Sequence, residues 1–350
     1  MRITEAKNSG IKADATRLPA EFEEQAFVQL IFPHAGSDWS PYLEEASKTF
    51  VNIATAIARF EKCLIVCDEI ERVKSYFPAT ENIDFITCET DDTWARDCSA
   101  ITVIENGEPT VIDFTFTGWG NKFDASLDNA MTAKIANYYG ANYKNERLIL
   151  EGGAIESNGE GLLLTTTECL LNPNRNAKLT QKFEIEHILN EAFGTKKVLW
   201  LDHGYLAGDD TDSHIDTLAR FADRETILYV KCTDEADEHY EALSKMEREL
   251  QALRDLDGKP FKLIALPMTD AIYYDGERLP ATYANFLIVN DAVIVPTYSD
   301  RHDEEALATV QKAFPEREIV GVDCSVLVRQ HGSLHCVTMQ FPKEVTLKIP

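Results

Sequence analysis

The chain has 350 residues, of which 44% are apolar and 27% are charged, so it can bury a large core. Its 59 acidic residues against 34 basic ones give a formal net charge of −25. This balance argues against partners such as nucleic acids and anionic membranes, whose binding depends on positive charge. It fits a protein that binds a cationic partner. The equal alternative is that the acidic residues only keep the protein soluble.

Other signals of location are absent from the sequence. The first 22 residues contain no apolar core of a secretory signal, and no stretch approaches the roughly 20 apolar residues of a membrane helix. The eight cysteines form no C-x-x-C pair and no spacing typical of a disulfide scaffold. Cys63 and Cys67 lie in an apolar run and are predicted core residues. We therefore expect a cytoplasmic protein.

Strands, helices and turns can be predicted in chain order. The first third predicts a strand, a helix, a strand and a hairpin over residues 24–34, 39–60, 61–69 and 96–116. The hairpin turns at Asn106-Gly107, the strongest short-range hairpin signal. The middle third predicts a hairpin, a helix and a strand over residues 151–166, 179–194 and 196–202. Gly194 is the stop signal of that helix.

The final third repeats this order. It predicts a hairpin, a helix and a strand over 214–230, 235–253 and 262–268, then a hairpin and a strand over 283–298 and 318–323. Residues 335–350 are predicted to form a closing hairpin that turns at Pro342-Lys343. About five units result, at roughly 50 to 70 residues each, with no flexible linker between them. We therefore expect an α/β repeat architecture and a single domain over residues 1–350.

Four of the hairpins are opened by residues that can carry chemistry: Asp97, Glu151, His214 with Asp216, and Cys336. If the units are arranged around an axis, these side chains converge on one spot. Each residue alone has a simpler interpretation, because a lone aspartate most often caps a turn or pairs with an arginine.

Cys336 follows His335 directly. Successive side chains of a strand point to opposite faces, so His335 is predicted to be structural and the partner of Cys336 is sought elsewhere. His214 is the candidate, because the pKa of histidine suits it to general acid and base work. His214 and Asp216 are two residues apart and share a face of an extended segment.

Three carboxylates, a histidine and a cysteine suit one kind of substrate, a planar cation with several donors. A guanidinium offers five N–H donors in a fixed fork, and carboxylates bind it through bidentate charged pairs. Its central carbon is an electrophile for a thiolate. The histidine can protonate the leaving ammonia and then activate water.

The sequence resembles the agmatine deiminase family, which includes the bacterial-type peptidyl-arginine deiminases. The resemblance is collinear over almost the whole chain, through "RLPAEFEEQAFVQLIFPH", "WARD", "LEGGAIESNGEGLLLTTTECLLNPNRN", "GDDTDSHIDTLARF", "YANFLIVNDAVIVPTY" and "HGSLHCVTMQ". It implies a five-bladed, pseudo-fivefold α/β propeller of ββαβ-like units. It also implies hydrolysis of agmatine to N-carbamoylputrescine and ammonia through an S-alkylthiouronium on the cysteine, with no metal and no organic cofactor. Peptidyl-arginine and free arginine are the alternative substrates, and a homo-oligomer is left open.

The resemblance also implies roles for individual residues. Cys336 would be the nucleophile and His214 the general acid and base, while Asp97 and Asp216 would hold the guanidinium and Glu151 would hold both guanidinium and histidine. Trp94 would line the substrate site, and Asp210 and Asp212 are candidates for holding the distal ammonium. The chain departs from the family pattern at Cys98-Ser99, at Ser213 and at His331-Gly332-Ser333, which bear on the identity of the substrate rather than on the type of reaction.

Two other classes of protein fit parts of this pattern. A metalloenzyme using His214, Asp216, His331 and His335 would explain the histidines but not Glu151 or Cys336. A non-catalytic module for basic peptides would explain the acidity, and it predicts binding that is indifferent to replacement of Cys336.

Overall fold

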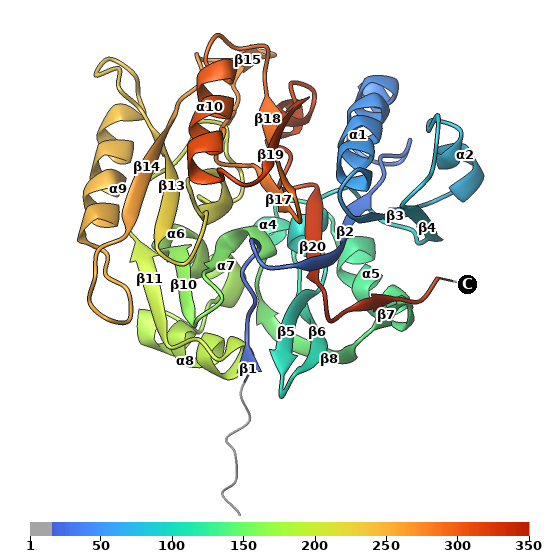
Figure 1. The fold of residues 1–350 in the computed structure, drawn as a ribbon, viewed down its shortest axis with the longest axis horizontal. Helices are drawn as coiled ribbons and strands as arrows, with labels where there is room; N and C mark the ends of the chain where they lie inside the picture. The colour runs from blue at the N-terminus through green and yellow to red at the C-terminus, as the bar shows by residue number, and fades with distance from the viewer. Residues whose placement is uncertain (1–15, 350) are drawn as a thin grey trace, which may run out of the picture.

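A β-hairpin, a helix and a further strand recur along the chain in the computed structural model, which describes residues 16–349 (Figure 1). In each unit the hairpin strands pair antiparallel, and the second of them pairs parallel with the strand that follows the helix. Parallel strands require such a crossover. Four units are contiguous in sequence: β5 (Ile101–Glu105), β6 (Glu108–Thr115), α5 (Ser126–Ile135) and β8 (Asn142–Ile149); β9 (Ile155–Ser157), β10 (Leu162–Thr166), α8 (Lys182–Phe193) and β11 (Lys197–Leu201); β12 (Ala219–Phe221), β13 (Thr226–Lys231), α9 (Tyr240–Ala252) and β14 (Lys262–Pro267); β17 (Leu287–Val289), β18 (Ala292–Thr297), α10 (Asp303–Ala313) and β19 (Glu318–Asp323).

The remaining unit joins the two ends of the chain. β20 (Thr338–Pro342) pairs antiparallel with β2 (Gln25–Ile31), and β2 pairs parallel with β3 (Lys62–Cys67) after the helix α1 (Leu43–Ala58). β4 (Ile83–Thr87) extends this sheet beyond β3.

The predicted closing hairpin over residues 335–350 is wrong. β20 pairs with β2, and β21 (Thr346–Leu347) pairs with β7 (Tyr139–Gly140). The rings of Phe27 and Phe341 stack with their centres 4.5 Å apart across the β2–β20 pair. A turn at Pro342-Lys343 reports only the local direction of the chain, whereas this aromatic contact selects the partner strand.

Short elements complete the chain. They are β1 (Thr16–Arg17), η1 (Ser40–Tyr42), α2 (Ile70–Lys74), α3 (Ala95–Cys98), α4 (Gly118–Asn121), η2 (Ala136–Tyr138), η3 (Gly152–Ala154), α6 (Thr167–Leu170), α7 (Pro173–Asn176), η4 (Ile215–Thr217), β15 (Tyr273–Tyr274), β16 (Glu277–Arg278) and η5 (Leu327–Gln330).

Local signals explain why the predicted helices form where they do. α8 begins with a capping box between Gln181 and Glu184 and ends at Gly194, whose φ of 66° lies in the left-handed region that glycine favours. α1 is amphipathic and buries Phe50 and Ile53. The helices α5 and α10 were not predicted.

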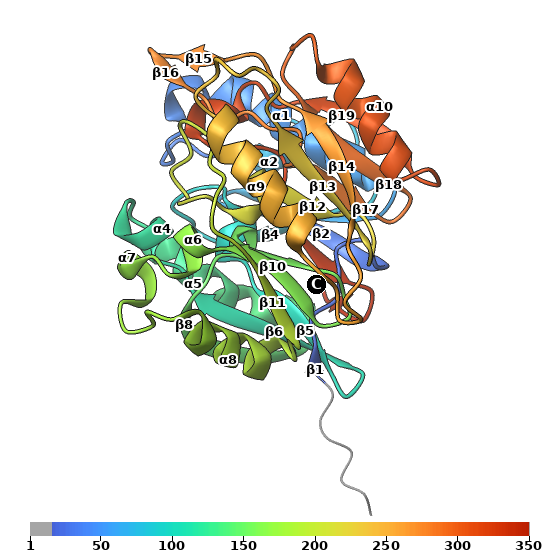
Figure 2. The same cartoon turned by 90° about the vertical axis from the view of Figure 1, so that its left-hand side faces the viewer.

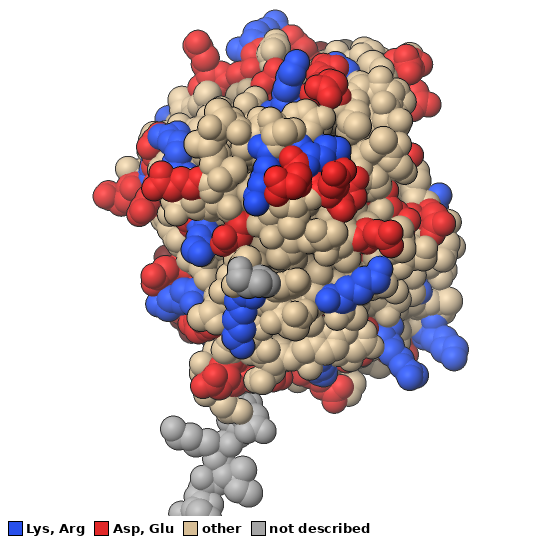
Figure 3. Space-filling view, turned by 90° about the vertical axis from the view of Figure 1, so that its right-hand side faces the viewer, with Lys and Arg blue, Asp and Glu red and all other residues tan. Residues whose placement is uncertain are grey.

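The long helices α1, α8, α9 and α10 lie at the periphery, while β2, β17 and β20 lie near the middle of the view in Figure 1 (Figures 1 and 2). On the face seen in Figure 3, basic side chains lie among acidic ones, so this face carries no continuous acidic patch. Within residues 16–349 no helix combines the length and the apolar character that a membrane crossing needs.

Candidate active site

Short turns in front of the hairpins carry the candidate catalytic side chains to the centre of the molecule. Asp97 lies in α3 before β5, Glu151 precedes η3 and β9, and Asp216 lies in η4 before β12 with His214 just ahead of it. Cys336 lies in a turn two residues before β20. All five side chains are buried.

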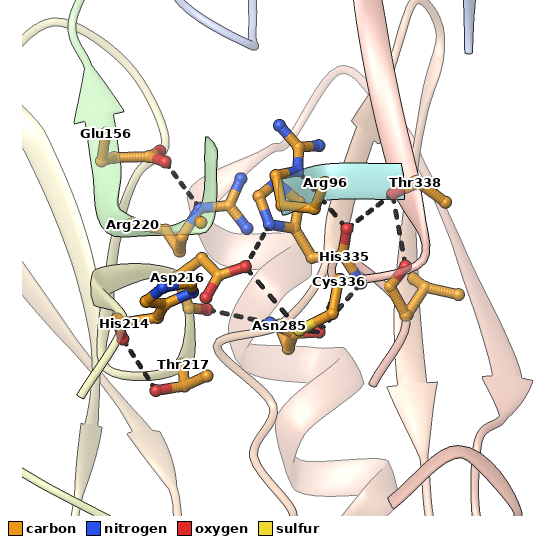
Figure 4. Close-up of polar contacts among 12 residues, drawn as sticks. Arg96, Glu156, His214, Asp216, Thr217, Arg220, Asn285, His335, Cys336 and Thr338 are labelled. Carbon is orange, nitrogen blue, oxygen red and sulfur yellow. Dashed lines mark hydrogen bonds and ion pairs between the residues drawn. The ribbon is translucent and has the colours of Figure 1, made fainter. Parts of the chain in front are cut away.

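These side chains lie close to one another, and Figure 4 shows three of them, His214, Asp216 and Cys336. The Nδ1 atom of His214 is 3.7 Å from Oδ1 of Asp97, and its Nε2 atom is 4.0 Å from Oε2 of Glu151. The Sγ atom of Cys336 is 3.9 Å from Oδ2 of Asp216. The structure therefore brings together the five residues that the sequence pattern singled out.

Gly153 makes this close approach possible. Its N–H donates to Oδ1 of Asp97 over 3.0 Å. A Cβ atom at this position would lie 2.6 Å from Nδ1 of His214 and 2.9 Å from Oδ1 of Asp97, closer than side-chain carbons pack. The glycine pair after Glu151 is thus part of the site rather than only a strand entry.

Sequence reasoning missed Asn285, which opens the hairpin β17–β18 at the position equivalent to the other four. Its Oδ1 atom accepts hydrogen bonds from the backbone N–H groups of His335 and Cys336 over 2.9 and 3.3 Å, and it lies 3.4 Å from the thiol. Its Nδ2 atom donates to the backbone carbonyl of Asp216 over 3.3 Å. The signal was available, because Asn285 is the polar residue in front of the one hairpin left without a candidate.

The two ring nitrogens of His335 contact carboxylates. Its Nδ1 atom is 2.7 Å from Oδ2 of Asp216, and its Nε2 atom is 2.7 Å from Oε2 of Glu21. This agrees with the prediction that His335 does not activate Cys336.

A cavity of about 520 Å³ leads to Cys336. Aromatic rings and aspartates line it, including Trp94, Phe116, Trp119, Phe123, Asp38, Asp92, Asp97, Asp124, Asp128 and Asp210. No lysine or arginine lines it among the residues that the structure describes. The cavity is therefore suited to a cation with an apolar stem.

Three residues were predicted to contact the part of the substrate beyond the guanidinium, and two of them line the cavity. Trp94 and Asp210 line the cavity, whereas Asp212 does not. The carboxylate of Asp212 lies 2.6 Å from Nη1 of Arg175 and 2.8 Å from Nζ of Lys122, so both its oxygens are engaged in ion pairs.

Trp119 is a second residue that sequence reasoning missed. Residues 118–121 all have positive φ, with 55° at Trp119, and this left-handed turn directs the indole N–H onto Oδ2 of Asp97 over 2.9 Å. Both oxygens of Asp97 are therefore hydrogen-bonded, one by Gly153 and one by Trp119.

Comparison of the chain with known proteins identifies its family. Residues 17–342 match the family model described as Porphyromonas-type peptidyl-arginine deiminase. The chain belongs to this family.

Individual relatives agree with this assignment. The chain is 32% identical to an agmatine deiminase of Ectopseudomonas mendocina, over 95% of this chain and 96% of that one. A solved structure of C. jejuni agmatine deiminase with substrate bound is 42% identical, with a TM-score of 0.90 over 96% of this chain and 99% of that one. Agmatine deiminase of Enterococcus faecalis is 31% identical, with a TM-score of 0.86 over 94% and 96%. An amidinotransferase from Microseira wollei, 12% identical with a TM-score of 0.53 over 95% and 99%, shares the fold alone.

Burial sets the protonation of the site in this member of the deiminase family. It lowers the pKa of His214 to about 3, so the ring is neutral near pH 7. Burial, together with the charges of Asp216 and Asp97, raises the pKa of the Cys336 thiol well above its ordinary value. Burial also raises the pKa of Asp97, with further contributions from Asp216 and Glu151. Before a cation enters, the thiol of Cys336 therefore holds its proton near neutral pH.

Asp216 behaves differently from Asp97. Burial alone would raise its pKa, but the hydrogen bond and charge of His335 more than offset this, so the pKa of Asp216 is lowered. Its Oδ1 atom and the Nε2 atom of His214 are buried and have no hydrogen-bond partner within residues 16–349. Both atoms are free to contact a ligand.

The site has a limited capacity for metal. Glu151, Cys169 and His214 offer ligand atoms within 4.8 Å of one another, but both oxygens of Glu151 accept from Nε of Arg175 over 2.9 Å. A guanidinium at this position opposes a second cation. The four residues of the metalloenzyme alternative form no such group within the described part of the chain.

Proposed function

We propose that the protein hydrolyses the guanidinium group of agmatine to N-carbamoylputrescine and ammonia. The observation that carries this proposal is the acidic cavity that ends at Cys336, whose thiol lies 3.9 Å from Oδ2 of Asp216. Oδ1 of Asp216 and Nε2 of His214 are buried without a hydrogen-bond partner among the described residues. The agmatine deiminase relatives support the choice of reaction.

Binding of the guanidinium would start the reaction. Its N–H groups would donate to Asp97 and Asp216, and its positive charge would lower the pKa of the neighbouring thiol. His214, which is neutral at pH 7, would take the thiol proton. The thiolate of Cys336 would then form a C–S bond to the guanidinium carbon.

His214 would next return that proton to a terminal NH₂ group, so that the C–N bond breaks and ammonia leaves. An S-alkylthiouronium is left on Cys336. His214 would then take a proton from water, whose oxygen attacks the same carbon, and the C–S bond would break. The proton on His214 and the one released from the hydroxyl restore the thiol and convert ammonia to ammonium, so one water is consumed and no oxidant or reductant is needed.

The cavity favours agmatine over free arginine. The α-carboxylate of arginine would need a cationic group, and the two candidates near the site are already engaged. Arg175 is buried between Glu151 and Asp212, and Arg329 forms a bidentate pair with Glu45 over 2.8 Å. The second positive charge of agmatine would instead contact the aspartates of the cavity wall. One of them is Asp210, whose pKa is raised to about 6 by burial and by the charge of Asp209.

We also propose that the five units close into a pseudo-fivefold propeller and form one domain over residues 1–350. The shared strand pattern, the pairing of β20 with β2 and the convergence of residues from separate units support this arrangement. All eight cysteines are free and buried, which supports a reducing, cytoplasmic location.

The test is ammonia release from agmatine, free arginine and an arginine-containing peptide, measured in parallel. We expect agmatine to be turned over and Cys336→Ala to lower the rate by more than about 10³-fold. Cys232→Ala is the matched control, because Cys232 is a buried free cysteine in a separate core cluster. Preferred turnover of the peptide would move the substrate to peptidyl-arginine, and no ammonia from any of the three would contradict the proposal.

A further inference from the structure

The segment between β1 and β2 contains a buried carboxylate, Glu21. The carbonyl of Phe22 accepts from Nη2 of Arg317 over 2.7 Å, and Nε2 of Gln25 donates to the carbonyls of Glu21 and Ile288 over 2.6 and 2.9 Å. These bonds fix the backbone on both sides of Glu21, which is only 6% exposed.

Every oxygen of the Glu21 carboxylate is used. Oε1 accepts from the backbone N–H of Ile288 over 2.8 Å. Oε2 lies 2.7 Å from Nε2 of His335 and 2.7 Å from Nη2 of Arg220. Arg220 is itself fixed, because its Nε atom donates to Glu156 over 2.9 Å.

His335 connects the Glu21 carboxylate to Asp216 in the active site. Both ring nitrogens lie 2.7 Å from carboxylate oxygens, so the ring bridges Glu21 and Asp216. Its partner on the other side is Oδ2 of Asp216, which leaves Oδ1 of Asp216 buried and without a partner.

We propose that Glu21 is a positioning residue of the active site, which acts through His335 to orient and charge the carboxylate of Asp216 for the guanidinium. This inference rests on the proposed function. Outer partners that fix the orientation of a functional group have measurable effects on activity even though they never touch the substrate.

The charges around this chain of contacts decide what happens when Glu21 is neutralised. The groups that face it from the surrounding elements are the acidic Asp97, Glu61, Glu151 and Glu156, the basic Arg96, Arg220 and Arg317, and His214 and Cys336. Burial alone would raise the pKa of Glu21, but Arg220 and His335 together hold the pKa well below its ordinary value, so the residue is an anion.

Without the carboxylate charge of Glu21, the His335 ring would lose the partner that holds its Nε2 atom and would be held less firmly against Asp216. The bond that lowers the pKa of Asp216 would weaken, and the carboxylate would take up a proton at a higher pH. We therefore expect the acidic limb of the pH profile of kcat/KM for agmatine to move upward in Glu21→Gln.

The experiment compares Glu21→Gln with Glu23→Gln, a matched variant of the same segment. Glu23 pairs with Arg17 over 2.7 Å and has no contact with the site. We expect Glu21→Gln to lower kcat/KM about 10- to 100-fold with the shifted acidic limb, and Glu23→Gln to leave both unchanged. Glu21→Asp, which keeps the charge, should restore part of the activity and the original limb.

Thermal unfolding of each variant separates positioning from folding. If Glu21→Gln does not fold, His335→Asn provides the test, because the shorter amide cannot bridge Glu21 and Asp216 as the ring does, and the same upward shift is expected. A wild-type pH profile in a folded Glu21→Gln or His335→Asn variant overturns the proposal. Absence of ammonia release by the wild-type protein instead overturns the proposed function, so the two failures are distinct.

Discussion

At the scale of single residues, the site shows which functional groups a sequence can reveal. Cys336 and His214 stand out because their side chains carry reactive chemistry wherever they occur. Asn285 and Trp119 act only through hydrogen bonds, on the backbone around Cys336 and on Asp97. Their residue types alone do not indicate a role, although the position of Asn285 in front of a hairpin does. Asp212 shows the converse, since its acidity suggested substrate binding but its carboxylate is held by Arg175.

Replacement of Trp119 tests the hydrogen bond to Asp97. Trp119→Phe keeps an aromatic ring in the cavity wall but removes the indole N–H that donates to Oδ2. A hydrogen bond to a charged group contributes about 1.5–3 kcal/mol, so we expect kcat/KM for agmatine to fall about 10- to 150-fold. Trp200→Phe is the control, because the indole of Trp200 donates to Glu186 away from the cavity. Equal activity of the two variants would show that the bond has no part in the reaction.

The proton on Cys336 leads to a second prediction. The pKa of the thiol is raised in the free site, so it holds its proton near neutral pH, and a guanidinium beside it favours the thiolate and lowers that pKa. Binding of a non-hydrolysed guanidine at pH 7.5 should therefore release protons. Calorimetric titration in buffers of different ionisation enthalpy measures the number released.

Cys336→Ser provides the comparison for that titration. Serine keeps the shape of the side chain but does not ionise in this pH range, so the variant should release fewer protons than the wild-type protein. An equal number in both would mean that the thiol is already ionised, or stays protonated, when the cation binds.

At the scale of elements, local and distant pairing were predicted with different success. The hairpins β5–β6 and β17–β18 form as expected, since a two-residue turn and the alternation beside it lie within one short stretch of sequence. The pairing of β20 with β2 joins residues that lie about 300 positions apart, and no turn signal spans that distance. For the same reason the contact between Glu21 and His335 could not be predicted from the sequence, because it joins the two ends of the chain.

The β2–β20 pair offers a test of how firmly the chain is closed. The ring of Phe341 is fully buried and stacks on Phe27 and Tyr139 with centre distances of 4.5 and 4.8 Å. Phe341→Ala should lower the free energy of unfolding by about 3–5 kcal/mol, measured by urea denaturation. Phe183→Ala, at a side chain that is 67% exposed, should change it little. A small loss at Phe341 would mean that the closure tolerates a cavity there.

At the scale of the whole molecule, fold and site depend on each other. The residues around the thiol come from separate units, so their spacing is set by how the units pack and not by any one unit. The N-terminal and C-terminal parts share a sheet, and that sheet begins two residues after Cys336. The pairing of β20 with β2 therefore helps to fix the position of the nucleophile.

The net charge of −25 makes a prediction at this scale. Acidic clefts concentrate cations, and salt screens this effect over about 10 Å at 0.1 M ionic strength. The cavity is lined by aspartates, without lysine or arginine among its described residues, so agmatine with two positive charges should depend on salt more than a guanidine with one. We expect kcat/KM to fall with added sodium chloride for both agmatine and butylguanidine, with the steeper fall for agmatine. Equal slopes would mean that the distal ammonium gains nothing from the field of the cavity, and that the acidity of the chain serves solubility rather than the choice of substrate.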